Sequence, residues 1–364
     1  MGANEQGGSG AASTKPIVCF LGPISSYTHQ ATMQVFPADQ FDLMPVTTIK
    51  DIFDTTQSGS ANYGVVPFEN STNGSVVFTL DNFADRSNVY GDLNVCREIY
   101  LDVHHCLVGR INTSSTSTSS APGAETDKEA GASGQQARSQ PSHSISHVRR
   151  VYSHPQAFGQ CTVFLGSRLR GIETVDVSST SRAAQLALAD ESGTSAAISS
   201  SVAAELLGLD VLARNIEDRD DNKTRFFVLR KGVEDNDTIA ASAATTPASS
   251  SIIPSETKTG GGEGEEDDAE LLSSTKSLLS FTVPHRSPGA LADVLSCFRR
   301  GGLNLTSINS RPSLAGAAAF EYIFFVEFEG HRFRDPRGRV ARVLGDVAAV
   351  ARTSRWLGSW ESMG

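Results

Sequence analysis

The N-terminal part of the chain alternates between two patterns of apolar residues. Short, continuous apolar runs, typical of buried strands, lie at residues 17–22, 63–68, 148–153 and 195–199. Stretches in which apolar residues recur every three or four positions, as on one face of a helix, lie at 29–36, 49–57, 76–84, 155–165, 181–189 and 202–207. Because most of the helical stretches follow a strand directly, the pattern predicts an α/β fold.

The C-terminal part has a shorter and more regular pattern. A strand is expected at residues 278–283, and the helix after it, from about residue 288, has apolar residues at helical spacing. Two further strands at 305–311 and 322–328, a second helix at 340–351 and a last strand at 356–360 follow. The order strand, helix, strand, strand, helix, strand predicts a separate βαββαβ unit.

Two internal segments interrupt these patterns. Residues 112–146 are mostly Ser, Thr, Gly, Ala and Gln, and residues 233–275 lead into the acidic run EGEEDDAE. Neither buries enough apolar surface to offset the entropy of an ordered chain. We therefore expect a disordered N-terminus (1–14), a first domain (15–231) with a low-complexity insert (112–146), a disordered acidic linker (232–275) and a C-terminal domain (276–364).

Length, charge and cysteine content narrow the class of protein. A chain of 364 residues exceeds what one core usually organises. With 31 basic and 41 acidic residues the net charge is -10, which disfavours nucleic acid and anionic membranes as partners. The cysteines lack zinc-site spacing, and no stretch approaches the roughly 20 apolar residues of a membrane span. The N-terminus lacks the apolar region of a signal peptide, so we expect a soluble, cytoplasmic protein with a small-molecule partner.

Hydroxyl and amide side chains gather in a series of turns between the expected elements. These turns lie at residues 22–30, 67–75, 153–157, 178–184 and 221–226. In α/β sheets, turns that follow strands collect at one edge, where backbone N–H groups and helix N-termini can hold an anion such as a carboxylate. Taken singly, most of them are also explained as helix caps, and His154 as a structural hydrogen-bonding group.

Two of the turns carry residues whose chemistry exceeds capping. A cap needs one polar side chain, whereas the turn at 67–75 packs Glu69, Asn70, Ser71 and Thr72 together. In the turn at 221–226, an arginine such as Arg225 can hold a carboxylate through two parallel hydrogen bonds, and a threonine hydroxyl can donate a proton. If the turn at 221–226 stood alone, an exposed arginine beside a turn threonine would explain it equally well.

In this order the turns resemble the prephenate dehydratase family. Sequences of that family read roughly GPxGTYSHQA, PxENSxxGxVxxTxD, SHPQAxxQC, STxxAA and DNxTRF, and this chain reads GPISSYTHQA, PFENSTNGSVVFTLD, SHPQAFGQC, STSRAA and DNKTRF. The chain departs at Ser25, Ser26 and Thr28, which stand where the family has Gly, Thr and Ser. Hydroxyl groups are kept at the last two positions, and the resemblance covers nearly all of the first domain.

The resemblance implies a bilobal catalytic domain, similar to periplasmic binding proteins, that holds prephenate between its lobes. It implies a monofunctional hydro-lyase of L-phenylalanine biosynthesis, which forms phenylpyruvate and requires no cofactor and no metal. Thr224 is the implied catalytic residue, acting by hydrogen bonding because a threonine is too weak an acid to act alone. The implied substrate-binding residues are Ser26, Asn70, Ser71, Gln156, Ser179, Thr180, Arg225 and Phe226.

The C-terminal unit resembles an ACT domain, a ferredoxin-like module that senses amino acids. The resemblance implies that L-phenylalanine binds as an allosteric effector at Gly289, Ala290, Leu291, Asn304 and Leu305. Asn309 stands where the family usually has Glu before Ser-Arg-Pro. Because ACT domains commonly pair edge to edge, we expect a homodimer or homotetramer.

Three other functions are compatible with parts of the sequence. Arogenate dehydratase differs only in a substrate with an amino group in place of the keto oxygen, and the turns scarcely separate the two activities. A non-catalytic bilobal binding protein would use Arg225 and the cleft without needing Thr224. A purely regulatory module would explain the C-terminal unit but none of the polar turns.

Overall fold

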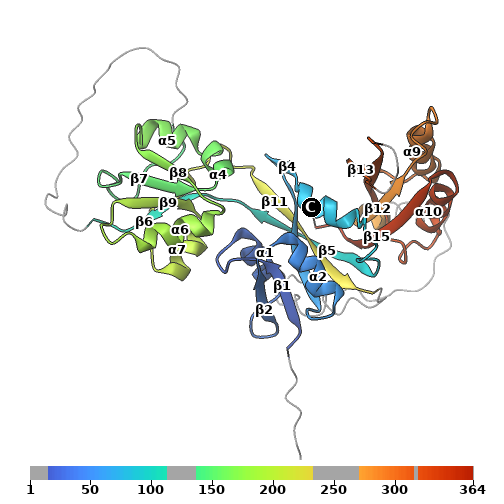
Figure 1. The fold of residues 1–364 in the computed structure, drawn as a ribbon, viewed down its shortest axis with the longest axis horizontal. Coiled ribbons are helices and arrows are strands. Elements are labelled where there is room, and N and C mark those ends of the chain that lie inside the picture. Colours follow the sequence, from blue (N-terminus) through green and yellow to red (C-terminus); the bar gives the residue numbers. More distant parts are fainter. Residues whose placement is uncertain (1–14, 113–136, 233–269, 315–318, 364) are drawn as a thin grey trace, which may run out of the picture.

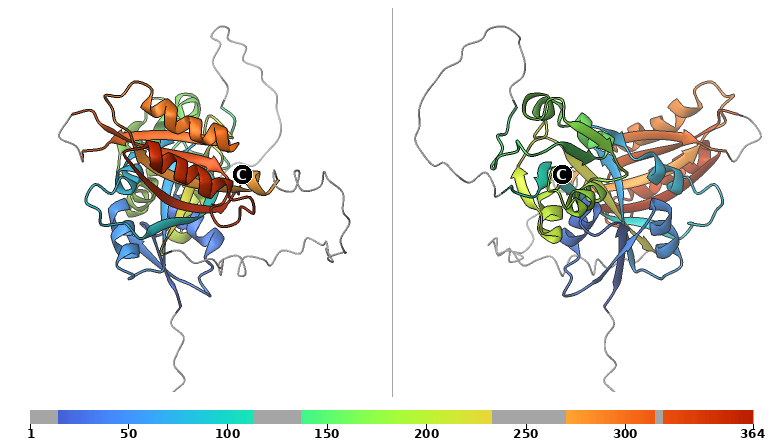
Figure 2. Two further views of the ribbon diagram at one scale, coloured as in Figure 1. Left: turned by 90° about the vertical axis from the view of Figure 1, so that its right-hand side faces the viewer. Right: turned by 60° about the vertical axis from the view of Figure 1, so that its left-hand side comes forward.

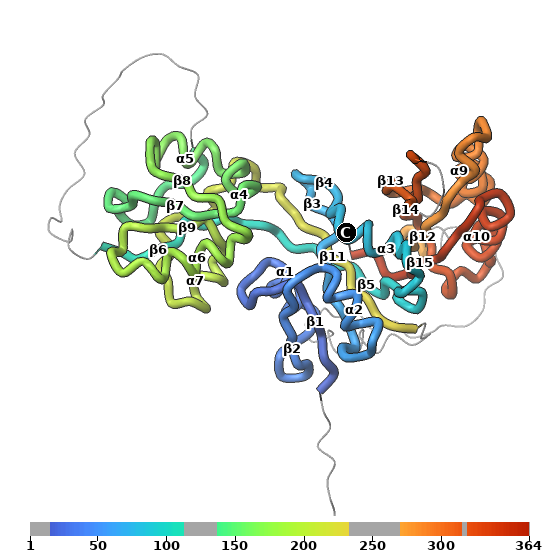
Figure 3. Tube along the Cα trace, viewed as in Figure 1, coloured from blue at the N-terminus to red at the C-terminus, as the bar shows by residue number. Residues whose placement is uncertain are grey.

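The computed structural model describes residues 15–112, 137–232, 270–314 and 319–363 (Figure 1). The expectations for the N-terminus and for most of the insert and the linker lie outside these residues. Along its longest axis the chain forms three bodies (Figure 3). A first lobe lies in the middle, with a second lobe on one side of it and the C-terminal domain on the other.

The first lobe is built on part of a large mixed sheet. Its strands, in the order β5-β11-β3-β1-β2, have the bounds β1 (Ile17–Leu21), β2 (Asp42–Val46), β3 (Tyr63–Asn70), β5 (Leu93–Asp102) and β11 (Lys223–Lys231), and the short β4 (Gly74–Ser75) pairs with β3. The helices are α1 (Tyr27–Val35), α2 (Ile49–Gln57) and α3 (Val77–Phe83). Two apolar cores lie against this part of the sheet, one around Phe53 and Phe227 and one around Phe20 and Phe226.

The second lobe has a sheet of its own, with strand order β10-β6-β9-β7-β8. Its strands are β6 (Cys106–Gly109), β7 (Arg150–Ser153), β8 (Glu173–Asp176), β9 (Ser195–Ser199) and β10 (Asp210–Ala213). Its helices are α4 (Pro155–Gly159), α5 (Thr162–Arg168), α6 (Thr180–Ala189) and α7 (Ser201–Leu207). Alanines of α6 and α7 pack with Ala197 of β9, which allows close contact between helix and sheet.

The chain crosses between the lobes twice, and the two crossings are hydrogen-bonded to each other. β5 leads out through residues 103–105 to β6, and residues 214–222 return from β10 to β11. The Val103 amide donates to the Asn222 carbonyl at 2.8 Å, and the Ile216 amide donates to the His105 carbonyl at 2.9 Å. The polar turn before β11 therefore lies in the hinge between the two lobes.

The C-terminal domain has the predicted βαββαβ order. Its elements are β12 (Thr275–Thr282), α9 (Ala290–Gly301), β13 (Leu305–Pro312), β14 (Tyr322–Glu329), α10 (Arg339–Val350) and β15 (Thr353–Glu361). Both helices lie on one face of the sheet β13-β14-β12-β15, where Val294, Phe298, Val343 and Val347 form its core (Figure 2). β13 is the outer strand of this sheet.

Gly358 marks the place where the C-terminal sheet joins the first lobe. β15 and β5 pair in parallel at the single position Gly358 and Val95. Gly358 has a φ of +142°, and a Cβ there would lie 2.1 Å from the Val95 carbonyl oxygen. Only glycine permits both this conformation and this approach.

We expect Gly358→Ala to destabilise the C-terminal domain by about 3 kcal/mol, because the new methyl group collides with backbone that has no room to move. Both tryptophans of the chain lie in β15, so the midpoint of urea unfolding by tryptophan fluorescence reports on this domain. Gly345→Ala is the matched control, since Gly345 is helical and its Cβ would meet nothing within 4 Å. An unchanged midpoint for Gly358→Ala would show that the two sheets do not depend on this contact.

One predicted helix is divided in the structure. The expected helix at 155–165 forms as α4 and α5, separated at Gln160 and Cys161. The carboxylate of Asp218, from the return crossing, accepts hydrogen bonds from the Thr162 and Val163 amides at 3.0 Å and so caps α5 from outside. The break leaves Gln160 at the end of α4, where its side chain faces the hinge.

Candidate functional site

The site is centred on a cross-strand pair, Asn70 at the end of β3 and Thr224 near the start of β11. The two residues are direct partners in the antiparallel ladder. Asn70 Nδ2 donates to Thr224 Oγ1 at 2.9 Å and also faces Asn222 Oδ1 at 2.8 Å. The structure thus brings together the second and fifth polar turns, which are more than a hundred residues apart in the chain.

The orientation of the Asn70 amide determines what Thr224 can do. Asn70 Oδ1 accepts hydrogen bonds from the amides of Thr72 at 3.0 Å and Asn73 at 2.9 Å, so its NH2 group must face Thr224. The Thr224 oxygen is therefore an acceptor in this pair. Within the described ranges the Thr224 hydroxyl donates no hydrogen bond, which leaves its proton available to a ligand.

Further hydrogen bonds extend from this pair across the hinge. Asn222 Nδ2 donates to Gln160 Oε1 at 3.2 Å, and the same oxygen lies 2.7 Å from His105 Nε2. His105 Nδ1 lies 2.8 Å from the Tyr27 hydroxyl, at the start of α1. A continuous series of side chains thus joins the first, second and fifth polar turns to the end of α4: Tyr27–His105–Gln160–Asn222–Asn70–Thr224.

His105 is held in one protonation state within this network. Burial lowers the pKa of His105, and its hydrogen bond to Gln160 only partly opposes that effect, so the ring is neutral at pH 7. Nε2 then donates to Gln160, and Nδ1 accepts from Tyr27, whose own pKa burial raises well above its ordinary value. Glu217 accepts from the His105 amide at 2.8 Å and fixes the backbone at this position.

Arg225, for which the sequence predicts contact with substrate, is held by carboxylates of the protein in this structure. Its guanidinium is buried and contacts three carboxylates: Glu69 at 3.0 Å, Glu98 at 3.4 Å and Glu327 at 2.8 Å. Burial lowers the pKa of Arg225, but the charge of Glu327 and its hydrogen bond outweigh this and raise it. Consecutive residues of a strand point to opposite faces, and in this arrangement the side chains of Thr224 and Arg225 lie on opposite faces of the sheet.

Phe226 is likewise not available to a ligand. Its side chain is only 1% exposed and belongs to the apolar core that contains Val18, Phe20 and Ile99. The sequence motif places it next to Arg225, but the strand directs it into the interior. Its role is to anchor β11 in the sheet.

Three predicted binding residues use their hydroxyl groups within the fold. Ser26 caps α1 by accepting from the His29 amide at 3.1 Å, and Ser179 caps α6 by accepting from the Arg182 amide at 3.0 Å. Ser71 donates to the Asp221 carbonyl at 3.0 Å and accepts from the Lys223 amide at 2.9 Å. Ser71 therefore holds the second and fifth turns together next to Asn70.

Gln156 and Thr180 lie at the start of helices of the second lobe. Gln156 is exposed at the beginning of α4, and its backbone N–H donates to Nδ1 of His154 at 3.2 Å. Thr180 is the first residue of α6 and is half-buried. Closer to the first lobe, Gln30 Nε2 donates to Ser200 Oγ at 2.9 Å, which joins α1 to the start of α7.

Four members of the hydrogen-bond network were missed as site residues. Tyr27, Gln160 and Asn222 stand inside the quoted motifs, so the motifs themselves contained the signal. His105 belongs to no polar turn and to no quoted motif. Only the fold shows that its segment, LDVHHC, crosses between the lobes.

The predicted effector residues form two separate groups in one chain. Gly289, Ala290 and Leu291 line a cavity of about 520 Å³, together with His285 and Phe324. Asn304 and Leu305 lie at the opposite end of the sheet, because Leu305 pairs with Phe328 whereas Thr282, which precedes the cavity, pairs with Ile323.

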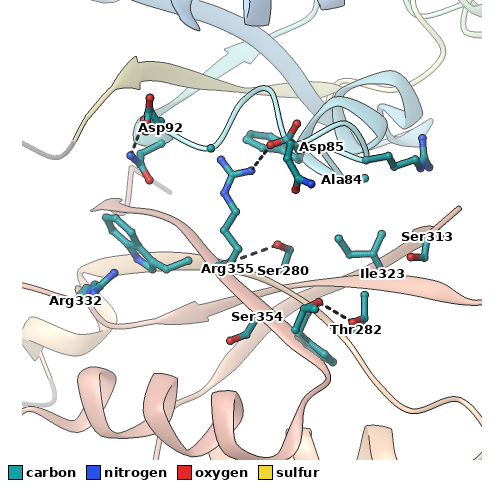
Figure 4. Close-up of a pocket in the computed structure, with 18 of the residues that line it drawn as sticks. Ala84, Asp85, Asp92, Ser280, Thr282, Ser313, Ile323, Arg332, Ser354 and Arg355 are labelled. Carbon is teal, nitrogen blue, oxygen red and sulfur yellow. Dashed lines mark hydrogen bonds and ion pairs between the residues drawn. The ribbon is translucent and has the colours of Figure 1, made fainter. Parts of the chain in front are cut away.

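A larger cavity of about 710 Å³ lies between the first lobe and the C-terminal sheet (Figure 4). The loop after α3 forms one wall, and β12 and β15 form the other. Arg355 reaches across it from β15, with contacts to Asp85 at 3.2 Å and to the Leu93 carbonyl at 3.1 Å. These contacts join the C-terminal sheet to the first lobe.

Within the described parts of the chain, no three His, Cys, Asp or Glu side chains converge to hold a metal ion. Among the same residues, no helix has the length and apolar character needed to cross a bilayer.

Two lobes joined by a double crossing, with a polar network at the hinge, define a bilobal α/β protein. Comparison with known proteins then gives the family. The prephenate dehydratase family model matches residues 18–234. The chain therefore belongs to the prephenate dehydratase family.

Individual relatives agree with this assignment. A bifunctional chorismate mutase/prephenate dehydratase of Aquifex aeolicus is 31% identical over 343 residues, which cover 94% of this chain and 73% of the relative. A prephenate dehydratase of Methanocaldococcus jannaschii is 26% identical, with 86% and 89% covered. The solved prephenate dehydratase of Arthrobacter aurescens, in complex with L-Phe, has a TM-score of 0.67 at 27% identity and covers 95% of this chain and 90% of its own.

Proposed function

We propose that this chain converts prephenate into phenylpyruvate, carbon dioxide and water at the Asn70–Thr224 pair. The observation that carries the proposal is that Thr224 Oγ1 accepts a hydrogen bond from the fixed amide of Asn70 and makes no donor bond within the described residues. The resemblance of the polar turns and the family assignment support the substrate. The mutase activity named for the bifunctional relatives is not part of this proposal.

The chemical step requires a hydrogen-bond donor at the oxygen of the leaving hydroxyl group. As the ring carboxylate leaves as carbon dioxide, the electrons of the broken C–C bond form the aromatic ring and expel the hydroxyl at the opposite ring carbon. Hydroxide is a poor leaving group, so a donor at that oxygen stabilises the charge that develops there. Thr224 supplies this donor as a hydrogen bond and keeps its own proton, and the departing hydroxide takes up a proton from solvent to become water.

The donor strength of Thr224 depends on Asn70. A hydroxyl that accepts one hydrogen bond becomes a better donor in the next, because the bonds polarise one another. The network through Asn222, Gln160 and His105 fixes both side chains before substrate arrives, so no reorganisation is needed during the reaction.

The two substrate carboxylates need other partners, because Arg225 is occupied by protein carboxylates. The start of α6 offers the Thr180 hydroxyl and free backbone N–H groups, which favour an anion. We propose that Ser179 and Thr180, with Gln156 from the start of α4, hold the carboxylates from the second lobe. Lobe closure about the hinge would then bring the leaving hydroxyl to Thr224.

Turnover of two substrates tests this proposal. Purified full-length chain should release phenylpyruvate from prephenate, followed by its absorbance in alkali, with a kcat/KM at least tenfold above that for arogenate. The reverse preference would make the chain an arogenate dehydratase. Tight binding of prephenate without product would indicate the non-catalytic binding protein.

For the C-terminal domain, we propose an ACT domain that binds L-phenylalanine and pairs with a second copy. The complex of the Arthrobacter aurescens relative with L-Phe supports the effector. Because Gly289 and Asn304 lie at opposite ends of the sheet, one effector can contact both groups only where two chains meet. The outer strand β13, on which Ile308 is 51% exposed, is available for such pairing.

We expect phenylalanine to reduce turnover at least fivefold and to bind with one molecule per chain. Light scattering should give the mass of a dimer or tetramer, and calorimetry the stoichiometry of binding. Leu291→Asp should abolish binding, because a carboxylate would occupy the apolar cavity beside Phe324. A monomeric chain that binds phenylalanine would contradict the shared site.

A further inference from the structure

A second cross-strand pair lies directly beside the catalytic pair and faces the opposite side of the sheet. Glu69 precedes Asn70 on β3, Arg225 follows Thr224 on β11, and the two are ladder partners. Arg225 Nη2 lies 3.0 Å from Glu69, and its guanidinium stacks over the rings of Phe68 at 5.0 Å and Phe227 at 5.4 Å. The direction of Arg225 is thus coupled, through one residue of backbone, to the position of Thr224.

The C-terminal domain supplies the strongest contact of this arginine. Glu327 of β14 lies 2.8 Å from Arg225 Nη1, and its side chain is only 2% exposed. Thr306 of β13 donates to Glu327 at 2.8 Å, so the carboxylate is fixed from its own domain. Thr306 also lies two positions from Asn304 in the predicted effector segment.

The cluster carries more negative than positive charge. Arg225 and Lys276 face Glu69, Glu98 and Glu327, and Lys276 lies 3.2 Å from Glu98, which is fully buried. A buried carboxylate without a cation is costly, so the two cations must be shared among the carboxylates in one arrangement. If Glu327 lost its charge, Arg225 would move toward Glu69 and Glu98 of the first lobe.

We propose that Glu327 is a positioning residue for the reaction, which holds Thr224 in place through Arg225, so that the C-terminal domain completes the catalytic site. Arg225 on this view orients the start of β11 and does not contact substrate. The inference rests on the proposed function, since it assigns a role in the turnover of prephenate. It also explains why Arg225 lies in the motif next to Thr224 although it faces another domain.

Steady-state kinetics of Glu327→Gln test the inference. The amide keeps the size of the side chain but not its charge, so we expect kcat to fall about tenfold while KM stays within twofold of the original chain. Arg225→Lys, which keeps the charge but cannot bridge three carboxylates, should show the same division. A tenfold higher KM for Arg225→Lys would indicate direct contact with substrate and overturn the inference.

Asp81→Asn is the matched control. Asp81 accepts two bonds from Arg311 at 2.9 Å across the same seam between the bodies, and its carboxylate pairs with Arg86 and Arg311 rather than with a side chain of β3 or β11. We expect its kcat and KM to stay within twofold of the original chain. An equal loss of kcat in Asp81→Asn would show that docking in general, not Glu327, controls the site.

The outcomes separate the inference from the function on which it rests. If Glu327→Gln retains the kcat of the unmodified chain, and the unmodified chain turns over prephenate, the positioning role alone is refuted. An unmodified chain that does not turn over prephenate refutes both. Thermal unfolding of each variant within about 3 °C of the original confirms that the comparison is between folded proteins.

Discussion

Replacing Thr224 by valine should lower kcat by about a hundredfold to a thousandfold and leave KM within about threefold. Valine has the shape of threonine without the hydroxyl, so the fold is kept and only the donor to the leaving oxygen is lost. The loss appears in kcat because that oxygen becomes negative only as the C–O bond breaks. Continuous measurement of phenylpyruvate release from prephenate gives both constants.

Thr224→Ser provides the control for this experiment. Serine keeps the hydroxyl and can still accept from Asn70, so its kcat should stay within tenfold of the original. Its added freedom about χ1 accounts for a small loss. If Thr224→Val retained more than a tenth of the original kcat, the hydrogen bond at the leaving oxygen would not be the main contribution of the protein.

Much of the fold could be predicted from apolar periodicity. The helix at 49–57 and the strand at 195–199 have the expected bounds, because α2 is strongly amphipathic and β9 is a continuous buried run. The pattern gave no expectation for β2, in which Pro45 interrupts the apolar residues, or for β5, which carries Arg97 and Glu98 among them. The charge of Glu98 looks incompatible with a buried strand until Lys276 and Arg225 are seen to neutralise it.

The candidate site could likewise be predicted only in part. Asn70 and Thr224 could be identified because each stands in a motif of the prephenate dehydratase family, although only the fold shows that they are partners in one pair of strands. The contacts of Arg225 could not be predicted, because its partner Glu327 lies in the C-terminal domain and outside every motif. A free guanidinium beside a polar turn suggests a carboxylate ligand, and the sequence does not show that the carboxylates come from the protein itself.

Asn70→Asp should reduce kcat by about a hundredfold, although it changes only NH2 to oxygen. The new carboxylate can still accept from the amides of Thr72 and Asn73, so the turn keeps its shape. Its other oxygen cannot donate to Thr224, and the threonine must instead donate its proton to the carboxylate. The proton that the leaving hydroxyl requires is then used inside the protein.

The pH dependence of this variant distinguishes loss of the donor from other damage. Below the pKa of the new carboxyl group, its protonated form can again donate to Thr224, so the ratio of variant to original kcat should rise as the pH falls. Asn222→Asp is the control, because it introduces the same charge one link further along and leaves the Asn70 amide in place to donate to Thr224. We expect it to lose less than tenfold in kcat. Equal losses in the two variants, with no recovery at low pH, would mean that negative charge near the hinge and not the direction of the Thr224 proton limits the reaction.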